Sequence, residues 1–346
     1  MIRASLVVVG FGSVGRSLVK IVAYRGRAIA NRYSLTLRVV GVVDSKGMAF
    51  KAGGFEEHEL LKLCELPRSG VSLFKPYARD YVDLEELYSE TQPDVHVELT
   101  PSNYETGEPG LSNILRALSR GVHVVTANKA PIALHYGELM SLARNRRTAL
   151  KFGATVMGGT PFIETLSHMK IHEIEHVEGI LNATTNYILT EMHKNLVDFE
   201  EALKRAKAIG VAEADPSLDI EGVDAAAKLT IISHVVGRSV KMSDVERESL
   251  TTVKLKDVVE ALRHGHVLKY VASLDLENGK AFVKVLRVPR ENLLATVDGT
   301  LNCVRVKTSV SDLVLVGKGG GGPETAYTVL NDVLSVIYAH PLGGFL

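Results

Sequence analysis

The spacing of apolar residues in the first part of the chain predicts a parallel sheet. Short β-branched runs alternate with segments that repeat apolar residues at helical spacing, a pattern typical of strands joined by crossover helices. The strands are expected at residues 5–9, 38–43, 95–99 and 122–125, with a helix over residues 111–120. The basic segment 25–38 is expected to be a loop, and residues 45–81 show only a weak pattern.

The last third of the chain predicts a sheet built from hairpins. Residues 271–276 and 281–288 alternate apolar and polar positions around Asn278-Gly279, a dipeptide that favours a tight hairpin turn. Residues 302–307 and 313–316 are expected to extend this sheet, and residues 326–338 to form a helix. This part of the chain therefore predicts an α+β arrangement.

Between these parts, residues 223–237 read V-D-A-A-A-K-L-T-I-I-S-H-V-V-G. The segment is apolar on every side, which predicts a buried helix. Asp224 and Lys228 are four residues apart and stack on one face, where such groups stay buried only when paired or used in chemistry. The alternative is that Asp224 caps the helix and forms an ordinary surface ion pair with Lys228, worth about 0.3–0.5 kcal/mol. Three further carboxylates lie in the irregular approach to this helix: Glu213, Asp215 and Asp219.

A glycine-rich turn follows the first predicted strand. It reads G-F-G-S-V-G and opens into a helical pattern, which is the context in which backbone N–H groups bind a pyrophosphate. We therefore predict that a dinucleotide binds at Gly10, Phe11, Gly12, Ser13, Val14 and Gly15.

The choice between NAD and NADP stays open in the sequence. Asp44 ends the second strand, 44 − 15 = 29 positions after Gly15, which is longer than the roughly 20 expected for the carboxylate that binds the ribose 2′-hydroxyl. Its negative charge favours NAD, whereas Lys46 and Lys51 nearby are compatible with NADP.

Together these patterns predict an α/β fold with two domains. The first is a Rossmann-type dinucleotide-binding domain over residues 1–152. The family resemblance carried by the segments given below implies that a C-terminal helix at about 323–346 completes it. The second is an α+β domain over residues 153–322.

Composition removes several classes of function. Lys and Arg together number 40, as do Asp and Glu, so the formal net charge is zero and nothing suggests a nucleic acid or membrane partner. The two cysteines, Cys64 and Cys303, do not form a disulfide framework, and no apolar stretch reaches the roughly 18 residues of a membrane span. We expect a soluble cytoplasmic protein.

Two short motifs lie between residues 153 and 180. Thr160 and Pro161 are expected to be the N-cap and first residue of a helix, which leaves free carbonyl groups in the loop before it. His172 to His176 spell H-E-x-x-H, the helical zinc-protease pattern, but the apolar spacing around them predicts a strand. We therefore do not interpret them as zinc ligands.

Four segments resemble one known family. Residues 208–228, A-I-G-V-A-E-A-D-P-S-L-D-I-E-G-V-D-A-A-A-K, are similar to the signature segment of homoserine dehydrogenases. The runs V-E-L-T-P-S-N-Y-E-T-G-E-P-G, G-V-H-V-V-T-A-N-K-A-P-I-A and G-I-L-N-A-T-T-N-Y-I-L resemble other motifs of the same family. The resemblance covers residues 7 to about 336.

The resemblance implies further cofactor contacts. They are expected at Thr100, Pro101, Asn128 and Lys129, which follow predicted parallel strands, and at Gly321 and Gly322 in the glycine-rich segment 317–327. That segment is expected to be a rigid loop before a helix, with a flexible linker as the alternative. It departs from the family at Lys318 and Gly320, where a proline and an alanine are usual.

The resemblance also implies the reaction, the NAD(P)-dependent interconversion of L-homoserine and L-aspartate 4-semialdehyde on the pathway to threonine, methionine and isoleucine. Lys228 and Lys129 are expected to orient the carbonyl and handle the proton, with Asp224 positioning Lys228. The proton donor among the two lysines stays open. The substrate is expected to bind at Glu213, Asp219, Asn182 and Thr184.

Three further expectations come from the family. A monovalent cation, sodium or potassium, is expected at backbone oxygens of Val156, Gly158 and Thr160, although Gly153 stands where many members carry an acidic side chain. A homodimer is expected through strands near Ala154 and residues 286–307. No kinase domain or C-terminal regulatory module is expected, and therefore no threonine inhibition through one.

Two other functions were considered. A phosphorylating semialdehyde dehydrogenase would need a reactive cysteine at a helix start, a setting that neither Cys64 nor Cys303 has in the sequence. A cofactor-binding sensor without enzymatic activity would bind NAD(P)H but transfer no hydride. An absorbance assay with homoserine and each cofactor separates these alternatives.

Overall fold

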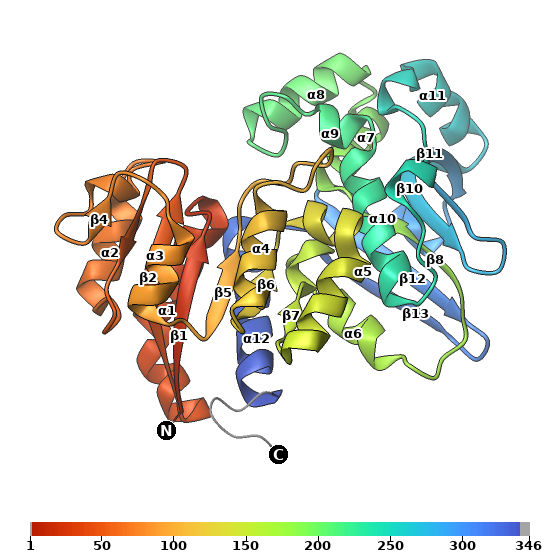
Figure 1. Ribbon diagram of the computed structural model, residues 1–346. Coiled ribbons are helices and arrows are strands. Elements are labelled where there is room, and N and C mark those ends of the chain that lie inside the picture. The colour runs from red at the N-terminus through yellow and green to blue at the C-terminus, as the bar shows by residue number, and fades with distance from the viewer. Residues whose placement is uncertain (1, 340–346) are drawn as a thin grey trace. The chain divides into compact units, whose positions relative to one another are not determined.

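The computed structural model describes residues 2–339 (Figure 1). The chain divides into two compact units. Within the described residues, unit 1 runs to Thr155 and resumes at Gly321, and unit 2 is Val156–Gly320. The end of the predicted C-terminal helix, residues 340–346, lies outside the described residues.

Unit 1 contains a seven-stranded sheet in the order β4-β3-β2-β1-β5-β6-β7. Its strands are β1 (Ile2–Val9), β2 (Leu35–Asp44), β3 (Gly47–Phe50), β4 (Ala78–Arg79), β5 (Val95–Glu98), β6 (His123–Thr126) and β7 (Leu150–Lys151). Neighbouring strands pair in parallel along the series β2-β1-β5-β6-β7. At one edge of the sheet, β3 pairs antiparallel with β2, and β4 pairs antiparallel with β3. The predicted parallel sheet is therefore confirmed.

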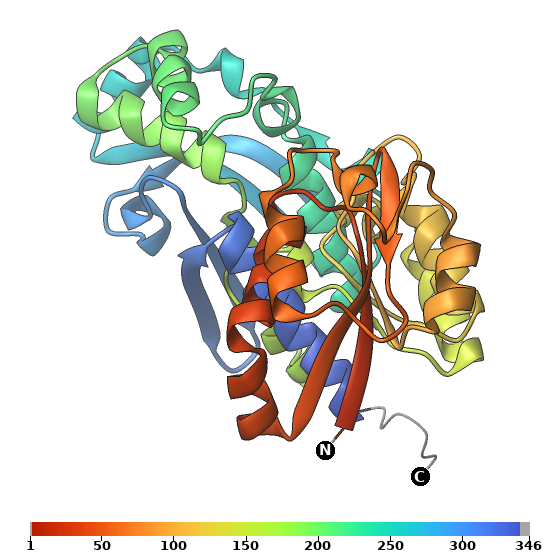
Figure 2. The same ribbon diagram turned by 90° about the vertical axis from the view of Figure 1, so that its left-hand side faces the viewer.

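Helices cover this sheet. They are α1 (Ser13–Tyr33), α2 (Glu57–Glu65), α3 (Leu84–Thr91), α4 (Gly110–Ser119), α5 (Lys129–Arg146) and α12 (Gly322–Ala339), with short 3-10 helices at Val71–Leu73 and Gly153–Thr155. Helix α12 lies alongside α1, and α4 packs on α5 (Figure 2). The main core joins buried side chains of α1 and α12 to those of β1 and β2.

One prediction for unit 1 was wrong. The segment 25–38 is not a loop, because α1 continues to Tyr33 with Ile29 buried, and ends only where Ser34 takes a left-handed φ of 50°. The weakly patterned residues 45–81 contain β3, α2 and β4. The strands there are only four and two residues long, too short for a period to be recognised.

Unit 2 contains a six-stranded sheet in the order β13-β12-β8-β10-β11-β9. Its strands are β8 (Ile174–Ile180), β9 (Glu246–Arg247), β10 (His266–Asp275), β11 (Lys280–Pro289), β12 (Leu301–Thr308) and β13 (Asp312–Lys318). The predicted hairpin is confirmed, since β10 pairs antiparallel with β11 along its whole length. Only β9 and β11 pair in parallel, so the sheet is mixed.

The helices of unit 2 are α6 (Phe162–His168), α7 (Ala183–Asn195), α8 (Phe199–Ala208), α9 (Ser217–Ile220), α10 (Val223–Val235) and α11 (Leu255–Arg263), with 3-10 helices at Met242–Asp244, Leu250–Thr252 and Leu293–Thr296. Helices α7 and α10 pack against β10 (Figure 1). The predicted burial of α10 is confirmed, because every residue from Asp224 to Ser233 is buried.

One local prediction for the start of unit 2 was also wrong. Thr160 does not cap α6, which begins at Phe162 with Pro161 at the N-cap. The Thr160 hydroxyl donates instead to the Lys318 carbonyl. In unit 1, the strand near Ala154 is β7, and Ala154 itself is buried in a 3-10 helix, so a dimer through strands near it stays a prediction.

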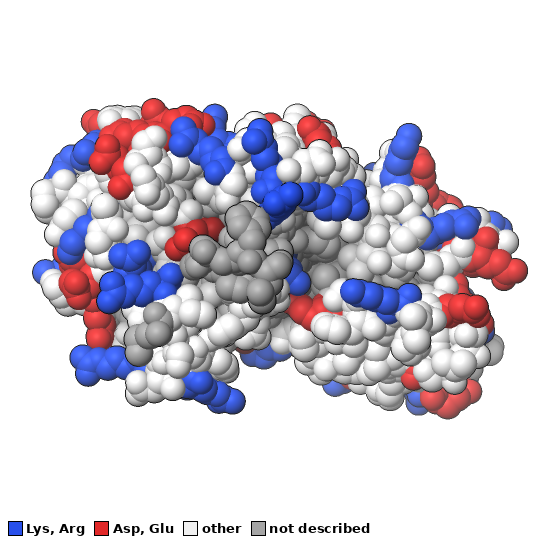
Figure 3. All heavy atoms as spheres, turned by 60° about the horizontal axis from the view of Figure 1, so that its bottom comes forward, with Lys and Arg blue, Asp and Glu red and all other residues white. Residues whose placement is uncertain are grey.

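Surface charge is mixed on the face that Figure 3 shows, where basic and acidic side chains are interspersed. Within residues 2–339, every helix is too short or too polar to cross a lipid bilayer.

Candidate active site

The turn after β1 provides the space that a pyrophosphate needs. Gly10 has a φ of 100°, and a Cβ there would lie 2.4 Å from the Leu99 carbonyl carbon. A Cβ at Gly15 would lie 2.5 Å from the Gly10 oxygen, so this glycine lets α1 pack directly on the turn. Gly12 faces open space and offers no side chain to cap the first N–H groups of α1. These are the three glycine roles of a dinucleotide-binding turn, and the residues present therefore fit the cofactor.

The start of α12 packs against the same turn. A Cβ at Gly322 would lie 2.4 Å from the Ser13 hydroxyl oxygen, and Gly321 before it has a φ of 120°. Phe11 is buried, with the Arg16 guanidinium 4.7 Å from its ring centroid. Val14 is half-buried one residue after Ser13. Unit 1 therefore brings the predicted residues of the turn and of the C-terminal glycine pair together.

Asp44 lies at the end of β2 with its carboxylate tied to backbone. One oxygen accepts from the Lys46 and Gly47 N–H groups at 2.8 and 3.1 Å, and the other from the Val71 N–H at 2.9 Å. The side chain stays partly exposed. The protein thus holds a negative charge at this strand end.

The loops after β5 and β6 are joined by side-chain hydrogen bonds. The Asn128 amide donates to the Thr100 hydroxyl at 3.1 Å and to the Pro101 carbonyl at 3.4 Å. Asn128 also caps α5 and accepts from the Ser102 hydroxyl at 2.9 Å. Lys129 is the first residue of α5 and is half-buried. The four predicted residues of these loops therefore lie together at the carboxyl ends of adjacent parallel strands, where ligands of such sheets bind.

In unit 2, Lys228 and Asp224 form a buried ion pair. The Lys228 Nζ lies 2.6 Å from the Asp224 carboxylate and donates to the Leu181 carbonyl at 2.6 Å. Lys228 is 6% exposed and Asp224 is 9% exposed, so the alternative of an ordinary surface ion pair is wrong. Asp224 is not the cap either, because Gly222 holds the N-cap position with a φ of 73° and its α-carbon faces the Tyr270 hydroxyl.

Asn182 connects this pair to a second carboxylate. Its amide nitrogen donates to Asp219 at 2.6 Å and to Asp224 at 3.0 Å, while its oxygen caps α7. The buried Thr184 donates to the Val211 carbonyl, two residues before Glu213. Glu213 is exposed and, within the described chain, has no hydrogen-bond or ion-pair partner. Unit 2 therefore gathers a lysine, two carboxylates and an amide, with Glu213 on the loop beside them.

The loop before α6 is packed closely in unit 2. The N–H groups of Gly158 and Gly159 donate to the Gly319 and Lys318 carbonyls, and the Thr160 carbonyl accepts from Phe162. Glu164, in the first turn of α6, has both carboxylate oxygens buried without a partner. A Glu at this position ordinarily reaches back to the N-cap N–H, but proline has no N–H to donate.

Neither cysteine fits a nucleophile. Burial raises the pKa of the Cys64 thiol and that of the Cys303 thiol to about 11 each. A thiolate is the reactive form, so both are inert at neutral pH. His176 lies on β8, where its ring contacts the Ser273 hydroxyl. In the described part of the chain, no three His, Cys, Asp or Glu side chains group in a way that could hold a metal ion.

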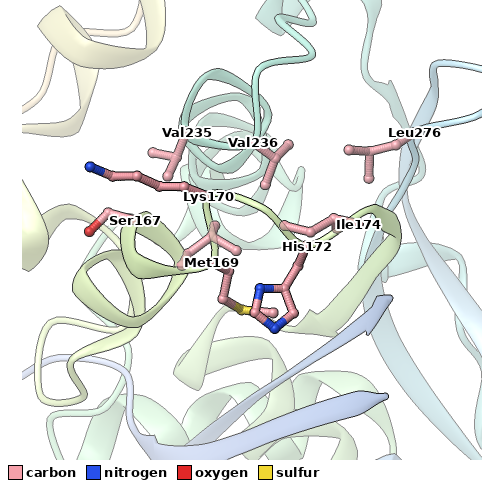
Figure 4. A pocket seen from close by; sticks show the side chains of 9 residues that line it. Ser167, Met169, Lys170, His172, Ile174, Val235, Val236 and Leu276 are labelled. Atoms are coloured by element: carbon pink, nitrogen blue, oxygen red, sulfur yellow. The ribbon is translucent and has the colours of Figure 1, made fainter. Parts of the chain in front are cut away.

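A small pocket of about 130 Å³ lies elsewhere in unit 2 (Figure 4). Val235 and Val236 at the end of α10 line it together with Met169, Lys170 and His172 from the segment after α6. This end of α10 is 11 residues, roughly 16 Å at 1.5 Å per residue, from Asp224. The pocket therefore does not belong to the Lys228 cluster.

Two family models match the chain. One is described as the NAD-binding domain of homoserine dehydrogenase and covers residues 10–152, and the other as homoserine dehydrogenase and covers residues 161–334.

The chain belongs to the homoserine dehydrogenase family.

Several relatives match over almost their full length. The homoserine dehydrogenase of Methanocaldococcus jannaschii is 36% identical over 96% of this chain and 98% of its own. An NAD(+)-dependent homoserine dehydrogenase of Pseudomonas canavaninivorans is 33% identical over 97% of each. A hyperthermophilic archaeal homoserine dehydrogenase mutant, solved in complex with NADPH, is 29% identical with a TM-score of 0.84 and covers 99% of this chain and 100% of its own. The chain accordingly has NAD(P)-dependent homoserine dehydrogenase activity, an oxidoreductase step of amino-acid biosynthesis.

Sequence reasoning missed one buried residue beside the predicted cofactor-binding loops of this homoserine dehydrogenase. Glu98 ends the apolar strand β5 and is fully buried, with its carboxylate against Thr100. A glutamate in a buried strand is unusual, and this was the available signal. His96 is two residues earlier on the same strand and therefore shares a face with Glu98, which the sequence does indicate. Asn113 lies on α4, so its contact with Glu98 is identified only by the tertiary structure.

Proposed function

We propose that the Lys228 cluster of unit 2 is the centre of the interconversion of L-homoserine and L-aspartate 4-semialdehyde. The observation that carries this proposal is the buried ion pair itself, with Lys228 held at 2.6 Å from both the Asp224 carboxylate and the Leu181 carbonyl. A lysine so placed in an apolar helix has a fixed position, as proton transfer in a transition state requires. Asp224 is then the positioning residue.

The proton is handled at the substrate oxygen. When the aldehyde is reduced, its oxygen gains negative charge, and the Lys228 ammonium donates a proton to it. When homoserine is oxidised, neutral Lys228 takes the hydroxyl proton. The bound nicotinamide supplies or accepts the hydride. Lys129, at the start of α5, is the second lysine that we assign to orienting the carbonyl and handling the proton.

The substrate ammonium needs negative charge, and we assign it to Asp219 and Glu213. Asp219 is half-buried and hydrogen-bonded to Asn182, which holds it in place. Glu213 is exposed and unpaired within the described residues, so its carboxylate is available to a ligand. Asn182 and Thr184 complete the set by fixing the two loops that carry these carboxylates.

Unit 1 binds the dinucleotide, with the pyrophosphate at the glycine turn and α12 completing the domain. This assignment is supported by the turn itself, where a side chain at Gly10 or Gly15 would collide with backbone atoms and Gly12 faces open space. Both cofactors are accepted, with NAD favoured, because Asp44 would repel a 2′-phosphate. One relative is named as NAD(+)-dependent and another was solved with NADPH, so both cofactors occur among similar proteins.

A monovalent cation binds at the carbonyl oxygens of Val156, Gly158 and Thr160. Gly153 stands where many family members carry an acidic side chain, so the cation would be bound without a side-chain ligand from that position. The shielded and unpartnered carboxylate of Glu164 argues for the cation, because a buried anion is costly without a counter-charge.

The protein is a cytoplasmic homodimer that associates through the unit 2 sheet near residues 286–307. Val314 and Val316 on β13 share a face with Leu286 on β11 by register, and Val316 is 46% exposed. Apolar side chains gathered on one sheet face favour association. The two buried, free cysteines fit a reducing compartment.

The decisive test follows NAD(P)H absorbance with homoserine for the wild type and for Lys228→Ala. Turnover by the wild type and its loss in the variant, with unchanged cofactor affinity, supports the assignment. Near-normal turnover in Lys228→Ala would refute it.

A further inference from the structure

A buried carboxylate stands directly behind Thr100. Glu98 is the last residue of β5, and its side chain is 0% exposed. Placing a carboxylate in such an environment costs several kcal/mol unless both oxygens accept hydrogen bonds. Glu98 therefore has either a strong structural reason or a functional one to be there.

Both oxygens of Glu98 are fully used. One accepts from the Thr100 backbone N–H at 2.7 Å and from the Thr100 hydroxyl. The other accepts from the Asn113 amide at 3.0 Å and contacts the His96 ring nitrogen Nε2 at 3.3 Å. Two of these contacts are to Thr100, a residue of the cofactor-binding edge.

A second layer fixes the direction of these bonds. The Glu98 carboxylate can only accept, so its contact with His96 Nε2 requires a proton on that nitrogen. The Tyr88 hydroxyl lies 2.8 Å from the other ring nitrogen, Nδ1, and donates to it. In this hydrogen-bonded series Tyr88 donates to His96, and His96 donates to Glu98, which is the final acceptor.

Through Thr100, Glu98 is connected to the loop before α5 and to the glycine turn after β1. Because the Thr100 hydroxyl proton points at Glu98, its oxygen is an acceptor for the Asn128 amide at 3.1 Å. Asn128 caps α5, whose first residue is Lys129. On the other side, the Thr100 nitrogen lies 2.6 Å from where a Cβ of Gly10 would stand, so Thr100 backs directly onto the glycine turn.

We propose that Glu98 is a positioning residue for hydride transfer. It holds Thr100 against the glycine turn and, through Thr100 and Asn128, holds the start of α5 at the cofactor edge. This inference rests on the proposed binding of the dinucleotide at that edge. Because every link belongs to unit 1, losing Glu98 changes cofactor affinity and kcat more than the KM for homoserine.

The first variant is Glu98→Gln, which keeps the size of the side chain. The glutamine NH2 group must face either the Thr100 N–H or the Asn113 and His96 donors. On that side a donor then faces donors, and their hydrogen bonds to residue 98 are lost. We expect the cofactor dissociation constant, measured by NADH fluorescence without homoserine, to rise about fivefold. We expect kcat to fall at least about tenfold, since a displacement of about 1 Å can cost about a hundredfold. The KM for homoserine stays within about twofold of wild type.

Glu59→Gln is the matched control. Glu59 is another buried carboxylate of unit 1, 8% exposed on α2, and it binds Lys51 and Tyr77 rather than the loops of the site. Its loss costs stability but leaves kcat and cofactor affinity at wild-type values. Equal kinetic losses in the two variants would show that Glu98 acts only through stability and would overturn the proposal.

A double-mutant cycle with Thr100→Val tests the route. If Glu98 acts through Thr100, Glu98→Gln/Thr100→Val is no more impaired than the worse single variant, whereas independent losses multiply. Multiplied losses, or wild-type kinetics in folded Glu98→Gln, overturn the inference. Wild-type kinetics in Thr100→Val instead overturns the cofactor role of Thr100, a separate result.

Should Glu98→Gln fail to fold, Asn113→Ala replaces it. Asn113 is half-buried on α4 and supplies one donor to the same carboxylate. A weaker cofactor affinity in this variant supports the proposal, and unchanged affinity and kcat overturn it.

Discussion

Comparing Lys228→Met with Lys269→Met separates chemistry from structure at a buried lysine. Both lysines belong to unit 2, and they are 6% and 2% exposed. Each donates to a backbone carbonyl at 2.6 Å, that of Leu181 or Val297. Each pairs with a carboxylate, Asp224 at 2.6 Å and Asp298 at 3.1 Å. In both variants methionine nearly keeps the length of the lysine side chain and removes its charge.

The expected stability losses are similar. Removing one partner of a fully buried pair costs about 3–5 kcal/mol. Both sites fall below that range, because Asp224 keeps its bond from Asn182 and the 40% exposed side chain of Asp298 keeps its ion pair with Lys194. We therefore expect each variant to lose about 2–3 kcal/mol of unfolding free energy. This loss lowers the Tm by roughly 5–10 °C in a unit of this size.

The expected kinetic losses differ sharply. General acid–base catalysis contributes about 10²–10⁴-fold, so kcat of Lys228→Met falls by that factor at a temperature where both variants are folded. Lys269→Met stays within about twofold of wild type. Homoserine oxidation is followed by NADH absorbance, and folding by circular dichroism. Near-normal kcat in Lys228→Met, or an equal loss in Lys269→Met, would show that the buried ion pair has no special chemistry.

Three further predictions concern single carboxylates. Asp219→Asn removes the charge that meets the substrate ammonium, so steady-state kinetics should show the KM for homoserine about tenfold higher or more with cofactor affinity unchanged; a shift in cofactor affinity alone would contradict it. Asp44→Asn should raise the NADP-to-NAD ratio of kcat/KM about fivefold, and an unchanged ratio would show that Asp44 serves only the backbone it binds. Burial raises the pKa of Glu59, but hydrogen bonds from Lys51, the Glu56 N–H and Tyr77 outweigh this and lower it to about 2. The depressed pKa stabilises the fold above about pH 4.5 by about 3 kcal/mol and this is lost as pH falls toward 2, so acid unfolding of Glu59→Gln should lack that part of the pH dependence.

The elements that sequence predicted well depend on neighbouring residues. The glycine turn, the buried helix α10 and the hairpin at Asn278-Gly279 each follow from a local pattern, because tight turns and helix faces are determined within a few residues. The errors occurred where a longer context decides. Residues 25–33 are helical because one face, with Ile29, packs on the core, which their basic composition concealed.

The residues of the Lys228 cluster were predicted from sequence, but their geometry was not. The sequence alone identified Lys228, Asp224 and Asp219, because ionisable groups in or beside an apolar helix must be paired or used. Only the tertiary structure decided that the Asn182 amide joins the two carboxylates from 37 and 42 positions away, that Leu181 presents its carbonyl to Lys228, and that Glu98 stands behind Thr100. The physical reason is that spacing along the chain determines which side chains share one helix or strand, whereas partners on other elements depend on how those elements pack.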